Sequence, residues 1–476
     1  MAAIGCGPCQ GCSDPDDGVG RPDRIAVEDA SDGDAVLPDR VEVRDDVEDA
    51  GDTREAEALD DAGGEDAPEA RDIPDYGDCG RDVQLWERVA GEEWCYEPEI
   101  RDLNPLRESP SPGCERVTFS GRVPAVSSWD VWNHLVGYLG SALSVAPGAR
   151  VVDTTTWLEE VVEPWDPSVG LPGRPVDSAP LHPELSAGGT LLDALKDGAS
   201  WSGTFVVYWD REARRKKMIY ADPEVGTYSL RGNHRVEDFN GRIGAVMRDE
   251  TAYSDVNLVA FDVRTLESWP ITNFPGGGNI WNSQMWDDLV VLNTGGSTLH
   301  LASLSERTLS VLAPHPTYQY EPTIHGRRIC WMDVRHGSGS PVGGYPVGEE
   351  VYCTDLDSGE MWSPSRTPGP TYGKRLPTVF GDWVAWDQYR RSEDGVWEDP
   401  RSPDGAPAND IPVYNHRLRR TWRVLERAEG FQSFAALWNP RLWGDYIYFL
   451  ALSRPAGTLR EVYRCELRVL FPEAFE

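Results

Sequence analysis

The chain has few basic side chains, and almost none of them is lysine. Its 476 residues include 45 Lys and Arg against 80 Asp and Glu, which gives a formal net charge of -35, and only four of the basic residues are Lys. Nucleic-acid binding relies on clustered Lys and Arg that neutralise phosphates. A chain this acidic would be repelled by the phosphates of nucleic acids and by an anionic membrane surface. The composition therefore excludes a general nucleic-acid-binding protein.

Long apolar runs and common catalytic motifs are also missing. No stretch approaches the ~18 uninterrupted apolar residues of a membrane-spanning helix. The sequence contains no Gly-x-Ser-x-Gly, His-Glu-x-x-His or Gly-x4-Gly-Lys-Ser/Thr motif, so serine-hydrolase, zinc-peptidase and P-loop chemistry are not expected. The eight His are scattered, and none pairs with another at metal-ligand spacing. We expect no cofactor and no metal centre.

Most of the negative charge lies near the amino terminus. Residues 13–78 contain 25 Asp or Glu, six Arg and a single aromatic residue, Tyr76. Such a segment cannot bury enough apolar area to offset the entropy lost on ordering. We predict a disordered, self-repelling tether over 13–78. A calcium-binding tail is disfavoured, because the twelfth residue of a loop starting at Asp14 is Ile25 and not Glu.

The first twelve residues suggest a lipid anchor. Met1-Ala2-Ala3-Ile4-Gly5-Cys6 resembles the end of a bacterial lipoprotein signal, which implies Cys6 as the lipidation site. The apolar stretch of such a signal is missing, so we interpret residues 1–12 as the remnant of a signal that starts upstream. The two acyl chains of a diacylglyceryl group would hold the protein at the bacterial outer membrane, on its periplasmic or surface face. Alternatives are loose thiols, or iron–sulfur ligation by Cys6, Cys9 and Cys12, which lacks a fourth Cys near position 16.

From about residue 120 the chain repeats a pattern of a Pro, a turn with Gly, and three short apolar runs. The clearest copies are residues 320–362 and 376–425. The central run occurs in seven places, at 132–139, 204–210, 242–249, 288–293, 328–333, 382–387 and 445–450. The runs are too short for helices, and their continuous apolar character indicates strands covered on both faces.

This spacing, about fifty residues per repeat, is typical of four-stranded propeller blades. We predict an all-β β-propeller over residues 114–476, preceded by a lead-in segment, 79–113. Seven blades fit best, although six or eight fit the spacing too. One motif, Pro377-x-x-x-Gly-Asp-x-Val-x-Trp-Asp387, and another, Val351-Tyr-x-x-Asp-Leu-x-x-Gly359, resemble the TolB-like family of β-propeller repeats. Such propellers include periplasmic scaffolds, peptidase domains and sugar-handling proteins, so the resemblance implies the fold and leaves the function open.

A propeller joins its last blade to its first so that no long sheet edge stays open. The last repeat is one strand short, and residues 114–119 could supply its outer strand. We therefore predict that Val117 lies near Val462 and that Cys114 pairs with Cys465. Cys330 and Cys353 fall on neighbouring antiparallel strands and are expected to pair, which leaves Cys79 with Cys95. The alternative is six free thiols.

Two sets of side chains are candidates for binding. Asp residues that end the central run either cap their turns and pair with nearby Arg, or form a ring that binds a cation in the channel; these are Asp210, Asp249, Asp333 and Asp387. Aromatic residues could form stacking platforms for sugars or partner loops; these are Trp281, Trp286, Tyr318, Tyr320, Trp383 and Trp386.

The hypothesis that combines these features is a monomeric, non-catalytic envelope lipoprotein whose propeller binds a protein or a glycan. The first alternative is a propeller glycan lyase or hydrolase that uses channel carboxylates. The second is a purely structural surface protein.

Overall fold

The computed structural model describes residues 90–96, 99–104, 109–118, 126–140, 148–164, 183–185, 189–195, 204–211, 213–221, 233–249, 256–274, 280–294, 298–312, 315, 318–335, 348–365, 372–390, 409–452 and 460–476. The predicted anchor and tether, residues 1–12 and 13–78, lie outside these ranges. All the described residues belong to one compact unit, Pro74–Glu476.

Seven antiparallel sheets, which we call blades 1 to 7 in chain order, form this unit. Blade 1 contains β4 (Val126–Trp132), β5 (Leu135–Gly140), β6 (Gly148–Asp153) and β7 (Leu158–Pro164). Blade 2 contains β8 (Pro183–Leu185), β9 (Gly189–Leu195), β10 (Thr204–Asp210) and β11 (Arg215–Ala221). Blade 3 contains β12 (Asn233–Phe239), β13 (Ile243–Asp249), β14 (Val256–Asp262) and β15 (Ser268–Pro270). Blade 4 contains β16 (Ile280–Trp286), β17 (Leu289–Thr294), β18 (Thr298–Ser303) and β19 (Thr308–Val311).

The last three blades follow the same plan. Blade 5 contains β20 (Gln319–His325), β21 (Arg328–Asp333), β22 (Glu350–Asp355) and β23 (Met361–Trp362). Blade 6 contains β24 (Tyr372–Phe380), β25 (Trp383–Arg390), β26 (Asn409–Asp410), β27 (Pro412–Asn415) and β28 (Arg420–Arg423). Blade 7 contains β29 (Ala436–Trp443), β30 (Tyr446–Leu452) and β31 (Arg460–Glu466). The described helices are short: α1 (Val424–Arg427), α2 (Leu467–Leu470) and two 3₁₀ turns, Glu429–Ser433 and Pro472–Ala474. No helix among the described residues is long and apolar enough to cross a membrane.

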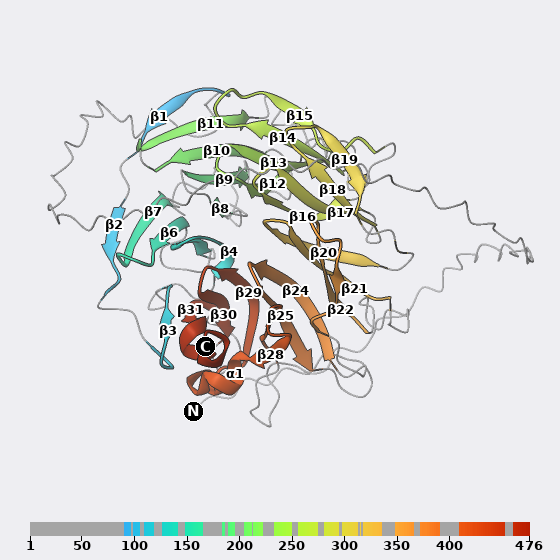
Figure 1. Cartoon of the computed structure of the whole chain (residues 1–476). Helices are drawn as coiled ribbons and strands as arrows, with labels where there is room; N and C mark the ends of the chain where they lie inside the picture. Colours follow the sequence, from blue (N-terminus) through green and yellow to red (C-terminus); the bar gives the residue numbers. More distant parts are fainter. Residues whose placement is uncertain are drawn as a thin grey trace, which may run out of the picture. The chain divides into compact units, whose positions relative to one another are not determined.

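The first strand of each blade lies at the centre of the ring. These inner strands contact one another in the order β4, β8, β12, β16, β20, β24, β29 and then β4 again, and Figure 1 shows them around a common centre with the later strands outside. The predicted seven-bladed propeller is therefore confirmed. One predicted run was assigned to the wrong strand: residues 204–210 form the third strand of blade 2, since β9 lies between them and β8. Asp210 ends this third strand and accepts a hydrogen bond from the Ala213 N–H, a turn cap that resembles the end of a central run.

The ring closes through the amino-terminal side, as predicted. Strand β3 (Cys114–Arg116) is the outermost strand of blade 7 and pairs with β31, with Cys114 opposite Cys465. The Val117 N–H donates to the Val462 carbonyl at 2.8 Å. Two more strands of the lead-in segment become fifth, outer strands: β2 (Glu99–Asp102) on blade 1 and β1 (Glu93–Cys95) on blade 2. The lead-in segment and β3 thus cover the outer edges of three consecutive blades, and of these edges only that of blade 7 was predicted from the sequence.

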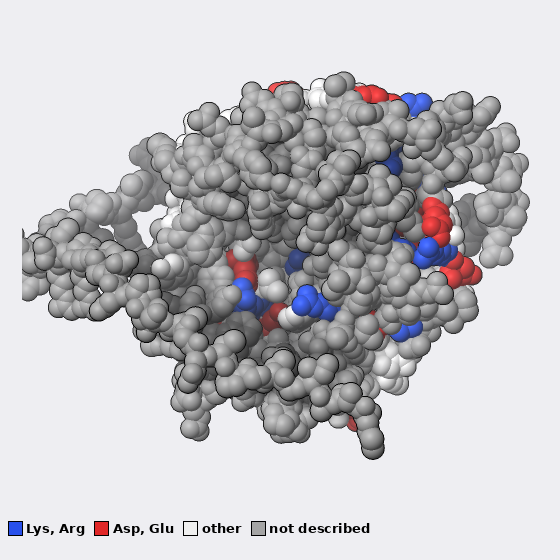
Figure 2. Space-filling model, turned by 180° about the vertical axis from the view of Figure 1, so that it is seen from behind, with Lys and Arg blue, Asp and Glu red and all other residues white. Residues whose placement is uncertain are grey.

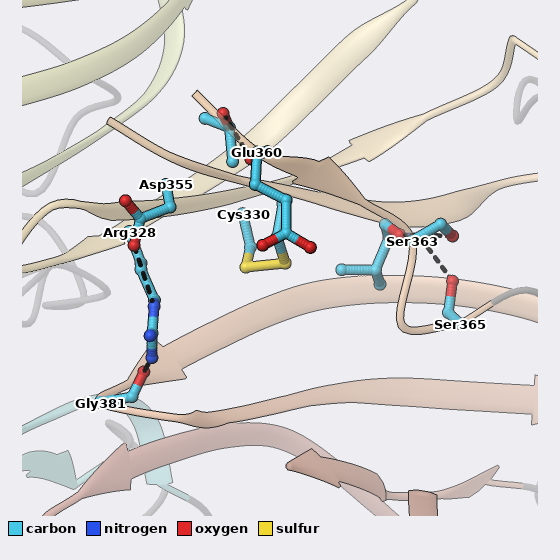
Figure 3. Close-up of a disulfide and its surroundings, with 10 residues drawn as sticks. Arg328, Cys330, Asp355, Glu360, Ser363, Ser365 and Gly381 are labelled. Atoms are coloured by element: carbon cyan, nitrogen blue, oxygen red, sulfur yellow. Dashed lines mark hydrogen bonds and ion pairs between the residues drawn. A yellow bond between two sulfur atoms is a disulfide. The ribbon is translucent and has the colours of Figure 1, made fainter. Parts of the chain in front are cut away.

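Two of the predicted disulfides are present among the described residues. Cys114–Cys465 joins β3 to β31, and Cys330–Cys353 joins β21 to β22. All four cysteines are fully buried. Beside the second disulfide, Arg328 extends to the next blade and donates to the Gly381 carbonyl at 2.6 Å (Figure 3). Cys95 is also disulfide-bonded; Cys79, its predicted partner, lies outside the described residues.

The apolar core lies between the blades. One cluster joins blade 5 to blade 6 through Met332, Trp362 and Trp386, and the next joins blade 6 to blade 7 through Trp383 and Phe449. Strands such as β17 and β30 are buried along nearly their whole length. Because each blade is covered on both faces by its neighbours, the strands read as continuous apolar runs rather than alternating ones.

Removal of the closing disulfide should weaken the ring strongly. Cys114→Ala/Cys465→Ala frees a closure that spans 351 residues, and loop entropy gives a loss of about 5 kcal/mol in the free energy of unfolding. The matched control, Cys330→Ala/Cys353→Ala, frees a separation of 23 residues and should lose about 3 kcal/mol. Urea unfolding measures both values, and an equal or larger loss in the control would contradict the closure argument.

Candidate functional site at the propeller axis

Six of the inner strands end in an aromatic residue. Phe239 of β12 contacts Tyr208 of blade 2, whereas the rings of the other five meet at the axis. They are Trp132 of β4, Trp286 of β16, His325 of β20, Phe380 of β24 and Trp443 of β29, and we call them the axial aromatic cluster. Each stands immediately before the turn that leads to the second strand of its blade. Equivalent positions in a repeat therefore place the rings at the same end of the channel.

The ring distances show that the cluster crosses the axis. Trp132 and Trp286 belong to blades 1 and 4, and their ring centroids lie 6.0 Å apart. Trp443 lies 4.7 Å from Trp132 and 5.6 Å from Trp286. His325 lies 4.0 Å from Trp286 and 3.9 Å from Phe380. Rings in contact from opposite sides of a channel occupy its width, so the cluster closes this end of the channel.

His325 belongs to the cluster as a neutral imidazole. Its Nδ1 accepts a hydrogen bond from the Gly381 N–H at 3.1 Å, so the proton of the neutral ring lies on Nε2. Burial, together with the positive charge of Arg328, lowers the pKa of His325 to about 4. The cluster therefore carries no charge near neutral pH.

Carboxylates on the first or second strands of three blades bind backbone N–H groups of the following blade. Asp238 of blade 3 accepts a hydrogen bond from the Met285 N–H of blade 4. Glu321 of blade 5 accepts from the Leu376 N–H of blade 6 at 2.6 Å. In the same way, Asp387 of blade 6 accepts at 2.7 Å from the N–H of Asn439 in blade 7.

A bulge in the inner strand explains two of these bonds. Pairing of β24 with β25 skips from Arg375 to Thr378, and pairing of β29 with β30 skips from Trp438 to Arg441. Within each bulge a residue with positive φ, Leu376 or Asn439, precedes a Pro. A bulge leaves an N–H without a partner in its own ladder, and Pro has no N–H to lose. The carboxylate of the preceding blade supplies the missing acceptor.

Burial raises the pKa of two of these carboxyl groups. The pKa of Asp238 rises to about 7, mainly through desolvation and then through the negative charge of Asp130. The Met285 and Phe239 N–H groups and the Arg441 guanidinium oppose the rise. Desolvation also raises the pKa of Asp387 well above its usual range. Asp130, Asp238 and Arg441 are thus close enough to interact electrostatically in the channel.

Acidic and basic side chains also reach the surface near the middle of the ring. Figure 2 shows them next to one another on the side opposite to that of Figure 1. No group of three or more His, Cys, Asp or Glu among the described residues could hold a metal ion.

A second buried polar cluster lies between blades 5 and 6. The Glu349 carboxylate accepts hydrogen bonds from the Tyr320 hydroxyl at 2.6 Å and from the Tyr389 hydroxyl at 2.9 Å. Lys374 donates from Nζ to the Glu349 carbonyl at 3.2 Å, and desolvation lowers the pKa of Lys374. Glu349, Lys374 and Tyr389 are at most 2% exposed. We interpret this network as a bond between two blades.

The structure places the predicted aromatic platforms in different surroundings and does not bring them together. Trp286 joins the axial aromatic cluster, whereas Tyr320 binds Glu349. Trp383 and Trp386 are buried between blades, which speaks against a stacking role. Tyr318 is 52% exposed. The side chain of Trp281 lies outside the described part of the structure.

The predicted ring of Asp residues is largely structural where it is described. The Asp333 carboxylate accepts hydrogen bonds from the Arg335 guanidinium at 2.6 Å and from the Trp331 indole at 3.1 Å. Asp210 caps its turn, and Asp387 binds the next blade. The side chain of Asp249 lies outside the described ranges.

Sequence analysis missed Trp132, His325, Phe380 and Trp443 as a group, and it missed Asp238. A signal was present: Ile324-His325-Gly326, Val379-Phe380-Gly381 and Leu442-Trp443-Gly444 place a ring directly before a glycine in three successive repeats.

Comparison with known proteins finds neighbours among solved structures. No family model matches the chain, and no curated protein matches it either. Among solved structures it is similar to an oligogalacturonate lyase in complex with manganese, at 12% identity and a TM-score of 0.49, over 82% of this chain and 100% of the other. It is similar to the β-propeller domain of the Trilobed protease from Pyrococcus furiosus, at 12% identity and a TM-score of 0.47, over 72% and 95%.

TolB from Acinetobacter baumannii is also similar, at 13% identity and a TM-score of 0.38, over 61% of this chain and 63% of TolB. At such identities the likenesses concern the fold alone and assign no ligand or reaction to this chain.

The raised pKa of Asp238 predicts a pH dependence of stability. A carboxyl group with a higher pKa in the folded than in the unfolded protein binds its proton more tightly when folded, so stability falls as pH rises from the ordinary Asp range to about 7. Asp238→Asn cannot ionise. From about pH 5 to about pH 8, wild type should lose ~1–3 kcal/mol of unfolding free energy relative to this variant.

Urea unfolding at the two pH values measures the difference between the two proteins. Asp287→Asn, at an exposed residue of a neighbouring hairpin, controls for the loss of one negative charge. Parallel pH profiles for wild type and Asp238→Asn would contradict the prediction.

Proposed function

We propose that this protein is a non-catalytic binding protein of the bacterial cell envelope. In this proposal the propeller is a rigid scaffold that binds a protein or a glycan at an end of its channel. The observation that carries the proposal is that the carboxylates at the axis are hydrogen-bonded to the backbone of the following blade.

The axial carboxylates serve the scaffold. Asp238, Glu321 and Asp387 each accept a backbone N–H from the following blade. Glu321 also forms an ion pair with Arg375 at 3.0 Å. A general acid or base must be free to exchange a proton with a substrate. Carboxylates bound in this way support a structural assignment, and with it a binding role for the ring.

The second candidate is the glycan lyase or hydrolase. One observation favours it: the Asp238 carboxyl has a pKa of about 7, and the negative charge of Asp130 contributes to that value. A carboxyl group with a raised pKa beside a second carboxylate is an arrangement that acid–base catalysis of glycan cleavage uses.

A cleavage assay distinguishes the two candidates. The full chain is incubated with a panel of neutral and acidic polysaccharides, and unsaturated uronates and new reducing ends are measured. The binding proposal expects no product above the buffer control. Product formed by wild type and lost in Asp238→Asn would overturn the proposal and establish the enzyme. Asp357→Asn, at a carboxylate that is 70% exposed on an outer turn of blade 5, is the matched control.

Two features support the envelope location. The described part of the chain contains two buried disulfides, and such bonds persist in oxidising compartments. The sequence around Cys6 resembles a lipidation site. In the proposal, the acidic segment 13–78 separates the propeller from the lipid at Cys6.

Metabolic labelling tests the anchor. The gene is expressed in a bacterial host from its complete reading frame, with an alkyne analogue of palmitate in the medium. We expect label on wild type and on Cys9→Ala, and none on Cys6→Ala, because only one of these thiols is proposed to carry lipid. Equal labelling of all three proteins, or of none, would refute lipid attachment at Cys6.

A further inference from the structure

The axial aromatic cluster differs from the aromatic residues of the core by its exposure. Trp331 and Trp386, two core residues, are 0% and 2% exposed. Trp132, Trp286, His325, Phe380 and Trp443 are each partly exposed, although the five rings contact one another. A closed channel end made of partly exposed rings is an apolar surface that a ligand can reach.

The hairpins leave this surface uncovered. The residues after His325, Phe380 and Trp443 are Gly326, Gly381 and Gly444, each with positive φ. A Cβ built on any of them would meet nothing within 4 Å. Three of the five rings are therefore followed by open space, where any other residue would place a side chain.

Polar groups surround the apolar surface. Asn133 and Asp287 follow Trp132 and Trp286 directly and are exposed. Asp445 stands two residues after Trp443, and its carboxylate is 53% exposed. The surface thus combines a neutral aromatic centre with hydrogen-bonding side chains at its border.

We propose that the axial aromatic cluster is a binding site for a pyranose ring of a neutral glycan. This inference rests on the proposed function, since it names the ligand class of a binding protein. The face of an aromatic ring is electronegative and attracts weakly positive hydrogens. One face of a pyranose presents such C–H groups, while hydroxyl groups extend from its edge. The edge would meet Asn133, Asp287 and Asp445.

The neutral state of the cluster favours this ligand over an anion. His325 is uncharged, because burial holds its pKa near 4 and its Nδ1 accepts the Gly381 N–H. The guanidinium of Arg328, which acts on His325, is bound to Asp382 at 2.6 Å and to the Gly381 carbonyl, and that of Arg468 pairs with Asp445 at 3.6 Å. A carboxylate or phosphate would find no unpaired cation on these residues.

Titration with neutral oligosaccharides tests the proposal on the full chain. Maltohexaose, cellohexaose and chitohexaose are the probes, and tryptophan fluorescence and calorimetry measure binding. We expect saturable binding of at least one probe with a change in fluorescence. Trp286→Ala should weaken it at least tenfold, since this ring contacts all four others of the cluster.

A second variant covers the cluster without altering a ring. Asn tolerates positive φ, and this chain uses Asn133 at φ 55 in the equivalent turn of blade 1. Gly381→Asn/Gly444→Asn should therefore fold and should weaken binding at least tenfold by occupying the open space. Trp269→Ala, at a partly exposed Trp of the outer strand β15, is the control and should bind as wild type does.

The outcomes separate this inference from the proposed function. No binding of any probe, or binding that both cluster variants retain, would overturn the sugar site, as would binding of tetramethylammonium or a peptide alone. These results would exclude a neutral sugar as the ligand of this site, but they would not show catalysis. The proposed non-catalytic binding role would therefore still stand. Cleavage of polysaccharides would overturn the non-catalytic assignment while leaving the sugar site to be judged by its own variants.

Discussion

The pairing of β3 with β31 is the constraint on which the rest of the structure depends. Blade 7 has three strands of its own, and β3 supplies the fourth, which ties the last sheet to the amino-terminal side of the ring. Three residue pairs, the Val117–Val462 hydrogen bond and a buried disulfide hold this joint. The joint lies where blade 7 meets blade 1, whose inner strands β29 and β4 are in contact. The geometry of the axial aromatic cluster is therefore a consequence of closure.

A second constraint acts at two of the steps from one blade to the next. Bulges in the inner strands leave backbone N–H groups without ladder partners, and the carboxylates of the preceding blade accept two of them. Burying a carboxyl group without a hydrogen-bond partner costs free energy. Here the bulge N–H and the buried carboxylate each supply the partner that the other needs. This explains why Asp387 and Glu321 lie beside the channel although no reaction has been assigned to them. It also explains the recurring Pro of the repeat, which occupies the bulge because it needs no acceptor.

Repeat spacing, strand composition and cysteine positions predicted the propeller, its closure and two disulfides. These features are local or repeat at a fixed interval, so they can be recognised in a single sequence. The assignment of residues 204–210 to a central strand was wrong because a capped third strand also ends in Asp. Two lead-in strands, β1 and β2, went unpredicted, since four-residue edges have no signal of their own and owe their pairing to neighbours far along the chain. Of the predicted stacking residues whose side chains the structure describes, Trp286 alone lies at the axis, because the sequence does not say which face of a strand points to the channel.

Composition and periodicity determined the fold class, the acidic character of residues 13–78 and the residues able to close the ring, because each follows from side-chain chemistry along a short stretch of chain. Only the tertiary structure decided which residues share the axis. Trp132, Trp286 and Trp443 are separated by more than a hundred residues, and their rings meet because equivalent strand ends of distant repeats are carried to one point. Convergence of this kind is a property of the closed ring, and no single repeat contains it.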